Sequence, residues 1–281
     1  MDAIPKSSFQ GSADFQSAVP QVFNLRIVLM LCIFLISSAP IFAQAPLPNP
    51  QSAIANPQFP PSATNFLARA KLAYELAQSH QATNTTNLKA NVDLARTAFD
   101  YADLAPTDHE REPIAIKGIS AGRAAVAIDS NSGPAHYYVA LNLGQFARTK
   151  MLGALKVLNE MERELKRALE LDPKLDYAGP NRTLGVLYLE APGWPTSLGS
   201  KTKARQNLMR ALELAPEYPE NHLNLIEALQ KWHETRDLPD RLAAYEKLLP
   251  AARTNFAGLQ WEDEWDSWGK RWKAIEDKSK K

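Results

Sequence analysis

The sequence predicts an all-α protein, an α-solenoid of about ten helices stacked as antiparallel hairpins into a right-handed superhelix. Three observations lead to this fold class. From residue 62 onward, apolar residues recur at spacings of three and four, which is the period of an amphipathic helix. Runs typical of β-strands are almost absent there. Short segments of one pattern also recur along the chain, as they do in repeat proteins.

The composition places the chain among ordinary globular proteins. Its 281 residues are 45% hydrophobic and 22% charged, which excludes a mostly disordered chain. The 32 Lys and Arg residues and the 31 Asp and Glu residues give a net charge of +1, so no overall electrostatic attraction to nucleic acid or to an anionic membrane is expected. Cys32 is the single cysteine, which excludes an internal disulfide framework and a cysteine-based zinc site.

The N-terminal segment has the pattern of an export signal. Arg26 is followed by ten apolar residues, 27–36, and small residues then lead to Ala43. We predict that residues 1–43 are a signal peptide with an N-terminal extension, that cleavage follows Ala43, and that no membrane span remains afterwards. The alternative is a membrane anchor through residues 27–42, although a spanning helix needs about 20 apolar residues.

A linker and two amphipathic stretches follow the signal. Residues 44–61 contain six prolines and no charged residue, which is typical of a stiff, extended linker. The first helical stripe after it consists of Leu67, Ala70, Ala73, Tyr74 and Ala77. The second consists of Leu88, Val92, Ala95, Phe99 and Ala102. We predict that the helical repeat domain covers residues 62–256.

Three segments share one pattern, a run of small and apolar residues that ends in proline. They are residues 100–106 (DYADLAP), 167–173 (RALELDP) and 210–216 (RALELAP), and residues 125–130 are a looser copy without the proline. The small residues allow neighbouring helices to approach closely, and the proline cannot continue a helix. We therefore expect each segment to end the second helix of a hairpin. Residues 107–130 are too short for two helices and predict a single one.

The first helices of three hairpins are expected after Pro134, Pro180 and Pro219. The second helices should each bury apolar residues at i, i+4 and i+7. These residues are Met161, Leu165 and Ala168, then Ala204, Leu208 and Ala211, then Ala244, Leu248 and Ala251. Residues 191–199 form an additional loop, and Ser200 is suited to cap the helix that follows it.

The last helix has a different composition. Four tryptophans share one of its faces, and four acidic residues fall on the others. They are Trp261, Trp265, Trp268 and Trp272, and Glu262, Asp263, Glu264 and Asp266. We interpret residues 257–281 as a capping helix with a charged tail, which covers the apolar flank of the last repeat and shows its charges to water. The alternative is an aromatic docking surface for a partner or a membrane interface.

The sequence contains no convincing catalytic or metal-binding motif. Residues 118–122 (GISAG) match the nucleophile-elbow pattern, but no strand system surrounds them, so close helix packing is the better interpretation of the glycines. Residues 193–202 have the wrong spacing for a phosphate loop. The five histidines show no metal-ligand spacing. We expect no enzymatic activity, no catalytic residue, no metal and no cofactor.

Two longer stretches carry a family resemblance. The helix endings and first-helix patterns resemble the tetratricopeptide repeat (TPR). Residues 136–148 (HYYVALNLGQFAR) and 171–188 (LDPKLDYAGPNRTLGVLY), with residues 191–195 and 199–204, are similar to the T-component of tripartite ATP-independent periplasmic (TRAP) transporters. The resemblance covers roughly residues 65–250. It implies a periplasmic, non-enzymatic protein that associates with a solute-binding protein and helps to deliver small, often hydrophobic, organic ligands. The chain departs from that family in lacking a convincing lipobox.

Ten polar and aromatic residues are candidates for a ligand or partner groove, because the concave face of such a stack is lined mainly by first helices. They are His136, Tyr137, Asn142, Arg148, Tyr177, Asn181, Arg182, Tyr188, Trp194 and His222. Tyrosine and tryptophan supply contact area, and arginine binds carboxylates as a fork. Structural roles are the alternative: Tyr188 would pack between its two helices, Arg182 would pair with Asp176, and residues 177–180 would shape a loop.

The leading functional hypothesis is an exported TPR protein that binds a partner protein or a small hydrophobic ligand as an accessory to TRAP-type solute uptake. Under this hypothesis the partner is a periplasmic solute-binding protein, and a homo-oligomer is compatible with it. The alternative is a general scaffold of the cell envelope that holds peptides or protein surfaces in its groove. Neither hypothesis involves nucleic acid.

Overall fold

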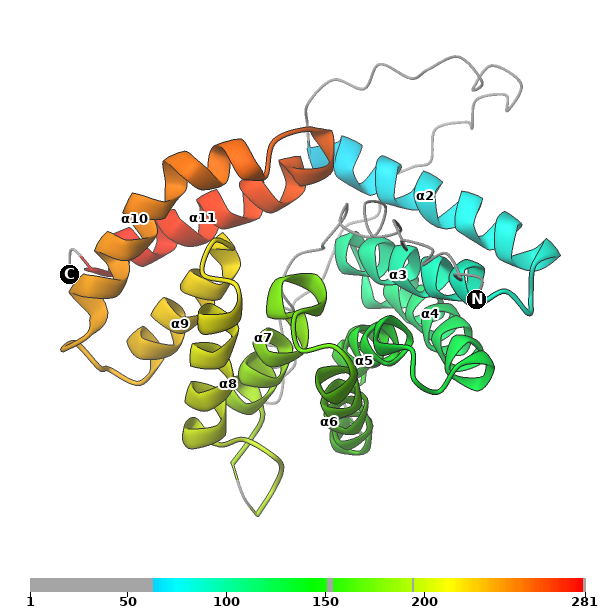
Figure 1. Ribbon diagram of the computed structural model, residues 1–281, viewed down its shortest axis with the longest axis horizontal. Helices are drawn as coiled ribbons and strands as arrows, with labels where there is room; N and C mark the ends of the chain where they lie inside the picture. The colour runs from blue at the N-terminus through cyan, green and yellow to red at the C-terminus, as the bar shows by residue number, and fades with distance from the viewer. Residues whose placement is uncertain (1–62, 151–153, 194, 280–281) are drawn as a thin grey trace, which may run out of the picture.

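The computed structural model describes residues 63–150, 154–193 and 195–279, which form ten α-helices and one short 3₁₀ helix (Figure 1). The elements are α2 (Ala63–Thr83), α3 (Leu88–Leu104), α4 (Asp108–Ile128), α5 (Gly133–Arg148), α6 (Ala154–Leu171), α7 (Leu175–Glu190), α8 (Lys201–Leu214), α9 (Pro219–Lys231), α10 (Leu238–Asn255), η2 (Leu259–Trp261) and α11 (Glu262–Ser279). These residues contain no β-strand, only an isolated bridge between Gly193 and Gly199. The predicted all-α stack of about ten helices is confirmed, whereas the predicted signal peptide and linker lie outside the described residues.

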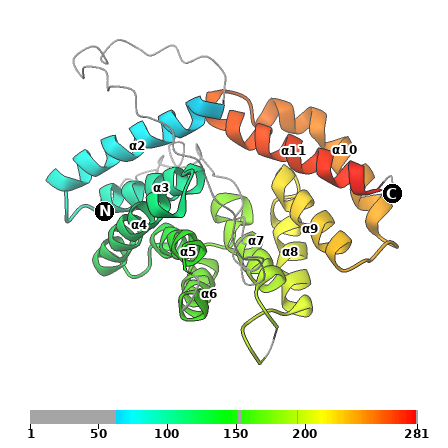
Figure 2. The ribbon, with the colours of Figure 1, turned by 180° about the vertical axis from the view of Figure 1, so that it is seen from behind.

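The helices form an arc of two layers. From α2 to α10 each helix packs against the next in sequence, most extensively in the pairs α3–α4, α4–α5, α5–α6 and α7–α8. Contacts also join α3 to α5, α5 to α7, α7 to α9 and α9 to α11. We call these five helices the inner layer. The views from front and back show α2 at one end of the arc and α10 with α11 at the other (Figures 1 and 2). The two ends meet where Nη1 of Arg69 lies 3.1 Å from Oε2 of Glu262.

The layer assignment of α3 corrects one sequence prediction. Residues 100–106 were expected to end a second helix, but α3 shares the inner layer with α5, and α4 is its hairpin partner. The single helix predicted over 107–130 is confirmed as α4. Arg111 on α4 caps the C-terminal end of α3. Its Nε donates to the carbonyl of Ala102 (3.1 Å) and its Nη2 to the carbonyl of Ala105 (2.8 Å). The Ala-Pro ending therefore marks where a helix stops and not the layer it occupies.

Side-chain caps fix where four helices begin. Asn87, Thr107, Ser132 and Ser200 each accept a hydrogen bond from the backbone N–H three residues further on. Such a cap satisfies one of the free donors at a helix start and is worth about 1 kcal/mol. The predicted cap at Ser200 is confirmed.

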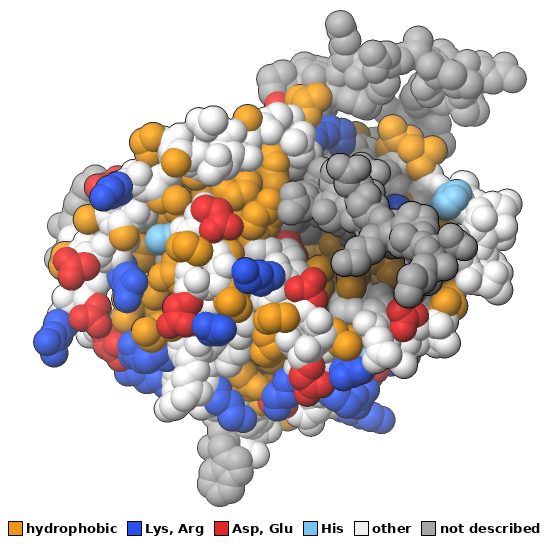
Figure 3. Space-filling view, in the orientation of Figure 1, with side chains coloured by type: hydrophobic (Ala, Val, Ile, Leu, Met, Phe, Trp, Pro, Cys, Tyr) orange, Lys and Arg blue, Asp and Glu red, His pale blue; other side chains and the backbone are white. Residues whose placement is uncertain are grey.

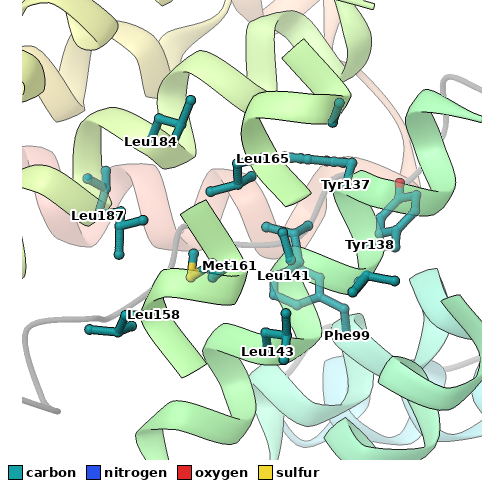
Figure 4. Packing of buried hydrophobic residues seen from close by; sticks show 14 of the residues in the cluster. Phe99, Tyr137, Tyr138, Leu141, Leu143, Leu158, Met161, Leu165, Leu184 and Leu187 are labelled. Atoms are coloured by element: carbon teal, nitrogen blue, oxygen red, sulfur yellow. The ribbon is translucent and has the colours of Figure 1, made fainter. Parts of the chain in front are cut away.

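The core lies between the two layers and is built mainly from leucine, alanine and aromatic residues (Figure 4). Two of the predicted second-helix stripes are buried, those of α6 and α8. The stripe predicted for α10 is wrong, because Ala244 and Ala251 are exposed and the buried residues are Tyr245 and Ala252. The physical reason is the packing of α10 on α11. Tyr245 contacts Trp272 of α11 with ring centroids 4.6 Å apart, so the buried face of α10 is shifted by one residue from the predicted face.

Glycines let α4 and α5 pack closely, as the sequence interpretation of residues 118–122 predicts. A Cβ on Gly118 would overlap the side-chain amide of Asn142, and one on Gly122 would lie 2.5 Å from Cγ2 of Val139. Asn142 cannot move aside easily, because its Nδ2 donates to the carbonyls of Ala95 and Tyr138, both at 2.8 Å.

Replacing Gly118 by alanine is expected to lower the free energy of unfolding by about 1–3 kcal/mol, because overpacking displaces the buried amide of Asn142. The matched control is Gly269→Ala on α11, where a Cβ meets nothing within 4 Å. Alanine favours a helix over glycine by up to about 1 kcal/mol, so the control should be neutral or stabilising. Urea unfolding followed by circular dichroism measures both. Equal effects of the two substitutions would contradict the close-packing role.

Candidate functional site

A left-handed turn interrupts the inner layer at the start of α7. Asp176, Tyr177 and Ala178 have φ angles of 52°, 51° and 64°. Left-handed helical geometry costs residues other than glycine roughly 1–2 kcal/mol each, so the surrounding structure must hold these three residues in place. Pro180 follows, and its fixed φ suits the first turn of the right-handed helix that continues from there. We call residues 176–178 the Asp176 turn.

Three side chains clamp this turn. Nη1 of Arg182 donates to the carbonyls of Asp176 (3.0 Å) and Tyr177 (3.1 Å), and its Nη2 donates to Oδ2 of Asp176 (2.8 Å). Nδ2 of Asn221 on α9 donates to the carbonyl of Tyr177 (3.1 Å). The hydroxyl of Tyr137 on α5 donates to Oδ2 of Asp176 (2.6 Å). The pair of Arg182 and Asp176, which the sequence analysis gave as the structural alternative to a groove role, is present, and three inner-layer helices meet at the turn.

A chain of buried charges continues from the turn to α11. Nε of Arg182 lies 3.3 Å from Oε2 of Glu220, and Nη1 of Arg271 lies 3.0 Å from Oε1 of the same carboxylate. Arg271 also pairs with Glu227 at 2.9 Å. Only 3% of Arg182 and 2% of Glu220 is exposed, so these charges depend on one another for compensation.

An aromatic cluster lies on the other side of the turn. It consists of Tyr177, Tyr218, Phe256, Trp261 and Trp268. The rings of Tyr177 and Tyr218 stack with centroids 4.6 Å apart, and Trp268 meets Tyr218 edge-on at 5.5 Å. The guanidinium of Arg182 lies 5.0 Å from the ring centre of Tyr218, a cation–π contact. Arg182 therefore joins the charges to the aromatic cluster.

Three buried polar atoms around the turn have no hydrogen-bond partner. They are Oδ1 of Asp176, Nδ2 of Asn181 and the hydroxyl of Tyr218. Burial raises the pKa of Tyr218 well above its ordinary value, and the charge of Glu220 adds to the effect, so its hydroxyl stays protonated as a donor. Buried polar groups are nearly always paired in native proteins, and leaving one unpaired costs about 1–3 kcal/mol. The arrangement thus offers one acceptor and two donors to a bound polar group.

Of the ten predicted groove residues, Tyr137, Tyr177, Asn181 and Arg182 come together at this turn. Asn142 and Arg148 lie elsewhere on α5. Asn142 tethers α5 to α3 as described above, and Nη1 of Arg148 pairs with Oδ1 of Asp103 at 2.9 Å. Trp194 lies outside the described residues. Tyr188 is 3% exposed and donates to Oε1 of Glu162 on α6 (2.6 Å), in keeping with packing between helices.

Two of the predicted groove residues, His136 and His222, make the same contact in different hairpins. Nε2 of His136 lies 3.0 Å from the carbonyl of Ser130, and Nε2 of His222 lies 2.7 Å from that of Pro216, in each case six residues earlier. Burial lowers the pKa of His222, although the hydrogen bond to Pro216 opposes this, so the ring is neutral and its Nε2–H donates. Both rings thus tie the turn before a first helix to that helix.

Sequence reasoning did not select Tyr218, Glu220 and Asn221 as site residues. All three surround Pro219, which marks the start of a first helix, just as Asn181 and Arg182 follow Pro180. Polar residues in the first turn after a repeat's proline are therefore the signal that would have found them. Their spatial partners on α7 and α11 follow only from the fold.

One acidic residue of α11 is buried, contrary to the prediction that all four show their charges to water. Glu264 is 3% exposed, and its Oε2 has no hydrogen-bond partner. Burial raises the pKa of Glu264 to about 12, and a hydrogen bond to Asp263 adds to the shift. Glu264 is therefore protonated in the folded protein at neutral pH. Burial likewise raises the pKa of Asp100 on α3 to about 8, although the positive charge of Arg96 opposes the shift.

Glu264→Gln is expected to make the protein less sensitive to rising pH. In the unfolded chain a glutamate ionises near pH 4.3, whereas in the fold Glu264 keeps its proton. Above pH 4.3 the free energy of unfolding therefore falls by about 1.4 kcal/mol per pH unit because of this group, and below pH 4.3 the group causes no such loss. Urea unfolding at pH 5, 6.5 and 8 should show the variant gaining on the native protein as pH rises, with the two converging near pH 4. Glu246→Gln, on the exposed side of α10, is the control and should follow the native curve. Parallel curves for all three proteins would show that Glu264 is ionised in the fold.

Charge distribution, helix length and metal-ligand grouping are the features of the described residues that bear on specialised binding. Acidic and basic side chains are interspersed over the lower half of the face in Figure 3, without a large patch of one sign. None of the helices described is long and apolar enough to cross a membrane. The same residues hold no group of three or more His, Cys, Asp or Glu side chains placed to bind a metal ion.

A comparison with models of protein families gives a match. The model of the family described as RMD1-3, regulator of microtubule dynamics protein 1-3, matches residues 63–179. The matched region runs from α2 to the Asp176 turn and so covers the N-terminal hairpins of the stack. Among curated proteins, no match was found. In this region the chain is therefore similar to a family that is distinct from the T-component resembled by its sequence motifs.

Proposed function

We propose that the protein is a non-enzymatic binding protein that holds a partner protein or a small organic ligand against the inner layer of its helical stack, at the Asp176 turn. The observation that carries this proposal is the set of unpartnered polar atoms of Asp176, Asn181 and Tyr218 beside the aromatic cluster. A bound molecule that supplies one donor and two acceptors would satisfy them, and the half-buried ring of Tyr177 would supply contact area.

The strained backbone of the turn supports the same assignment. Three consecutive left-handed residues are costly, and such strain concentrates at functional sites, where other contacts hold it in place. The clamp by Arg182, Asn221 and Tyr137 keeps the turn in one geometry before a ligand arrives. A preorganised site loses less conformational entropy on binding.

The finer proposal is a TPR protein exported to the periplasm, where it acts as an accessory to TRAP-type uptake and its partner is a solute-binding protein. It rests on the signal pattern before Ala43 and on the resemblance of residues 136–148 and 171–188. The matched family is named for regulation of microtubule dynamics, and its match follows the helical hairpins of the stack. We do not carry the named activity over to this chain.

Native mass spectrometry of the full chain, produced in an exporting host under its own signal, tests the proposal. We expect a chain that begins at Gln44 and carries a bound small molecule or a co-purifying protein. Asn181→Ala removes one unpartnered donor and should reduce the bound fraction at least fivefold. Asn207→Ala, a half-buried residue of α8 away from the turn, is the matched control and should leave it unchanged. A mass that retains Arg26 would contradict cleavage, and equal retention by both variants would exclude the turn as the site.

A further inference from the structure

A cavity of about 560 Å³ opens at the C-terminal end of the arc, away from the Asp176 turn. It lies between the end of α9, the start of α10 and the last turn of α11. Its volume falls within the range of small-molecule sites in proteins, about 300–1,000 Å³. None of its lining residues belongs to the clamp or to the aromatic cluster, so it is a separate feature of the molecule.

The lining combines an apolar floor with a polar rim. Leu229, Leu238 and Leu242 form the floor. Leu229 is buried in the core, whereas Leu238 and Leu242 are only half-buried, which leaves apolar surface open to a ligand. Gln230 ties the end of α11 over this floor, since its Nε2 donates to the carbonyl of Ile275 (3.3 Å).

The rim of the cavity presents a positive charge to a ligand, because its acidic residue is already paired. Glu234 is the acidic residue of the lining, and its carboxylate is already bound by Lys201 (2.7 Å) and Arg205 (2.5 Å). Lys278 and His233 also line the cavity, and within the described part of the chain no acidic side chain pairs with either of them. An anionic group at the mouth would therefore meet an ammonium and an imidazole without competition from Glu234.

The backbone at His233 adds an independent observation. Its φ is 57°, and it occupies the position after α9 where glycine is the usual residue. The N–H of His233 donates to the carbonyl of Gln230 (3.1 Å) and that of Glu234 to the carbonyl of Leu229 (3.0 Å), the bonds that end a helix in this way. Histidine here costs stability that glycine would not, and it places an imidazole at the cavity.

We propose that this cavity binds a monocarboxylate with an apolar tail, the tail resting on Leu238 and Leu242 and the carboxylate held by Lys278 and His233. The apolar floor requires the tail, and the two rim donors select an anion over a neutral or cationic head group. The site is independent of the function proposed for the Asp176 turn.

Isothermal titration calorimetry with dodecanoate, below its micellar concentration, tests the proposal on the full chain. Dodecanoate should bind with a stoichiometry of one, and dodecylammonium should bind at least tenfold more weakly. Lys278→Gln should weaken dodecanoate at least fivefold and leave 1-dodecanol unchanged. Lys273→Gln, an exposed residue of the same helix that does not line the cavity, is the matched control and should change neither.

His233→Gly separates a ligand role from a structural one. Relief of the left-handed strain should raise the melting temperature, while loss of the imidazole should weaken dodecanoate binding. A purely structural histidine would give the first effect without the second. Asn181→Ala should leave dodecanoate binding unchanged, which distinguishes this site from the Asp176 turn. Absence of dodecanoate binding, or equal affinity of the native protein and the Lys278→Gln variant, would overturn the proposal.

Discussion

Replacing Arg182 by alanine is expected to lower the free energy of unfolding by about 3–5 kcal/mol. The substitution leaves the buried carboxylate of Asp176 without its cation and removes one of the cations that pair with Glu220, and an uncompensated buried charge is among the costliest defects in a folded protein. It also releases the carbonyls of Asp176 and Tyr177, which hold the left-handed turn to the start of α7. Both losses act on the junction of α5, α7 and α9.

Urea unfolding followed by tryptophan fluorescence measures the effect, because Trp261 and Trp268 lie in the adjoining aromatic cluster. Arg210→Ala is the control. Arg210 pairs with Glu213 at 3.0 Å, but both side chains are more than half exposed, and such surface pairs contribute about 0–1 kcal/mol. A loss for Arg182→Ala as small as that of the control would mean that water enters the junction and solvates the carboxylates.

Arg182→Lys tests which feature of the arginine matters. Lysine keeps the positive charge but lacks the planar fork that reaches two carbonyls and two carboxylates at once. A destabilisation between those of the native protein and the alanine variant is expected. Full recovery with lysine would show that the turn is held by charge compensation alone.

Local patterns predicted most of the helices, for a physical reason. Proline ends or begins a helix through its own ring, and a capping side chain such as Ser200 bonds to a backbone group three residues away. These effects depend on neighbours in sequence, so helix ends can be predicted from the sequence. The close packing at Gly118 was also predictable, because a glycine in a helix has few other uses.

Features that depend on neighbours in space were not predictable. The burial of Tyr245 in place of Ala244 follows from the docking of α11 on α9 and α10, and nothing within α10 itself requires it. Glu264 lies four residues before Trp268, at the edge of the tryptophan face, so its burial follows once that face docks on the stack. The Asp176 turn lies between these cases: the sequence marks a loop before Pro180, but its left-handed geometry depends on Asn221 and Tyr137 from other helices.

Trp268→Ala is expected to destabilise the protein by about 3–5 kcal/mol, the second large effect among the predictions. Trp268 is 2% exposed and contacts Tyr218, Phe256 and Trp265 edge-on, with centroids 4.8–6.1 Å apart. Its removal leaves a large void in the cluster that joins α11 to the rest of the inner layer. Chemical unfolding measures the loss, and near-ultraviolet circular dichroism reports on the packing of the remaining rings.

The outcome decides between the two interpretations of the last helix. A helix that serves mainly as a cap seals the apolar flank of the stack, so its weakening should expose that flank and increase binding of a hydrophobic dye at urea concentrations below the main transition. Leu259→Ala is the control, because this residue is 68% exposed and its loss should change stability by less than about 0.5 kcal/mol. A Trp268→Ala variant with native stability and altered partner binding would instead identify a docking surface. The burial of Trp261 and Trp268 favours the cap, since a docking surface requires aromatic rings that a partner can reach.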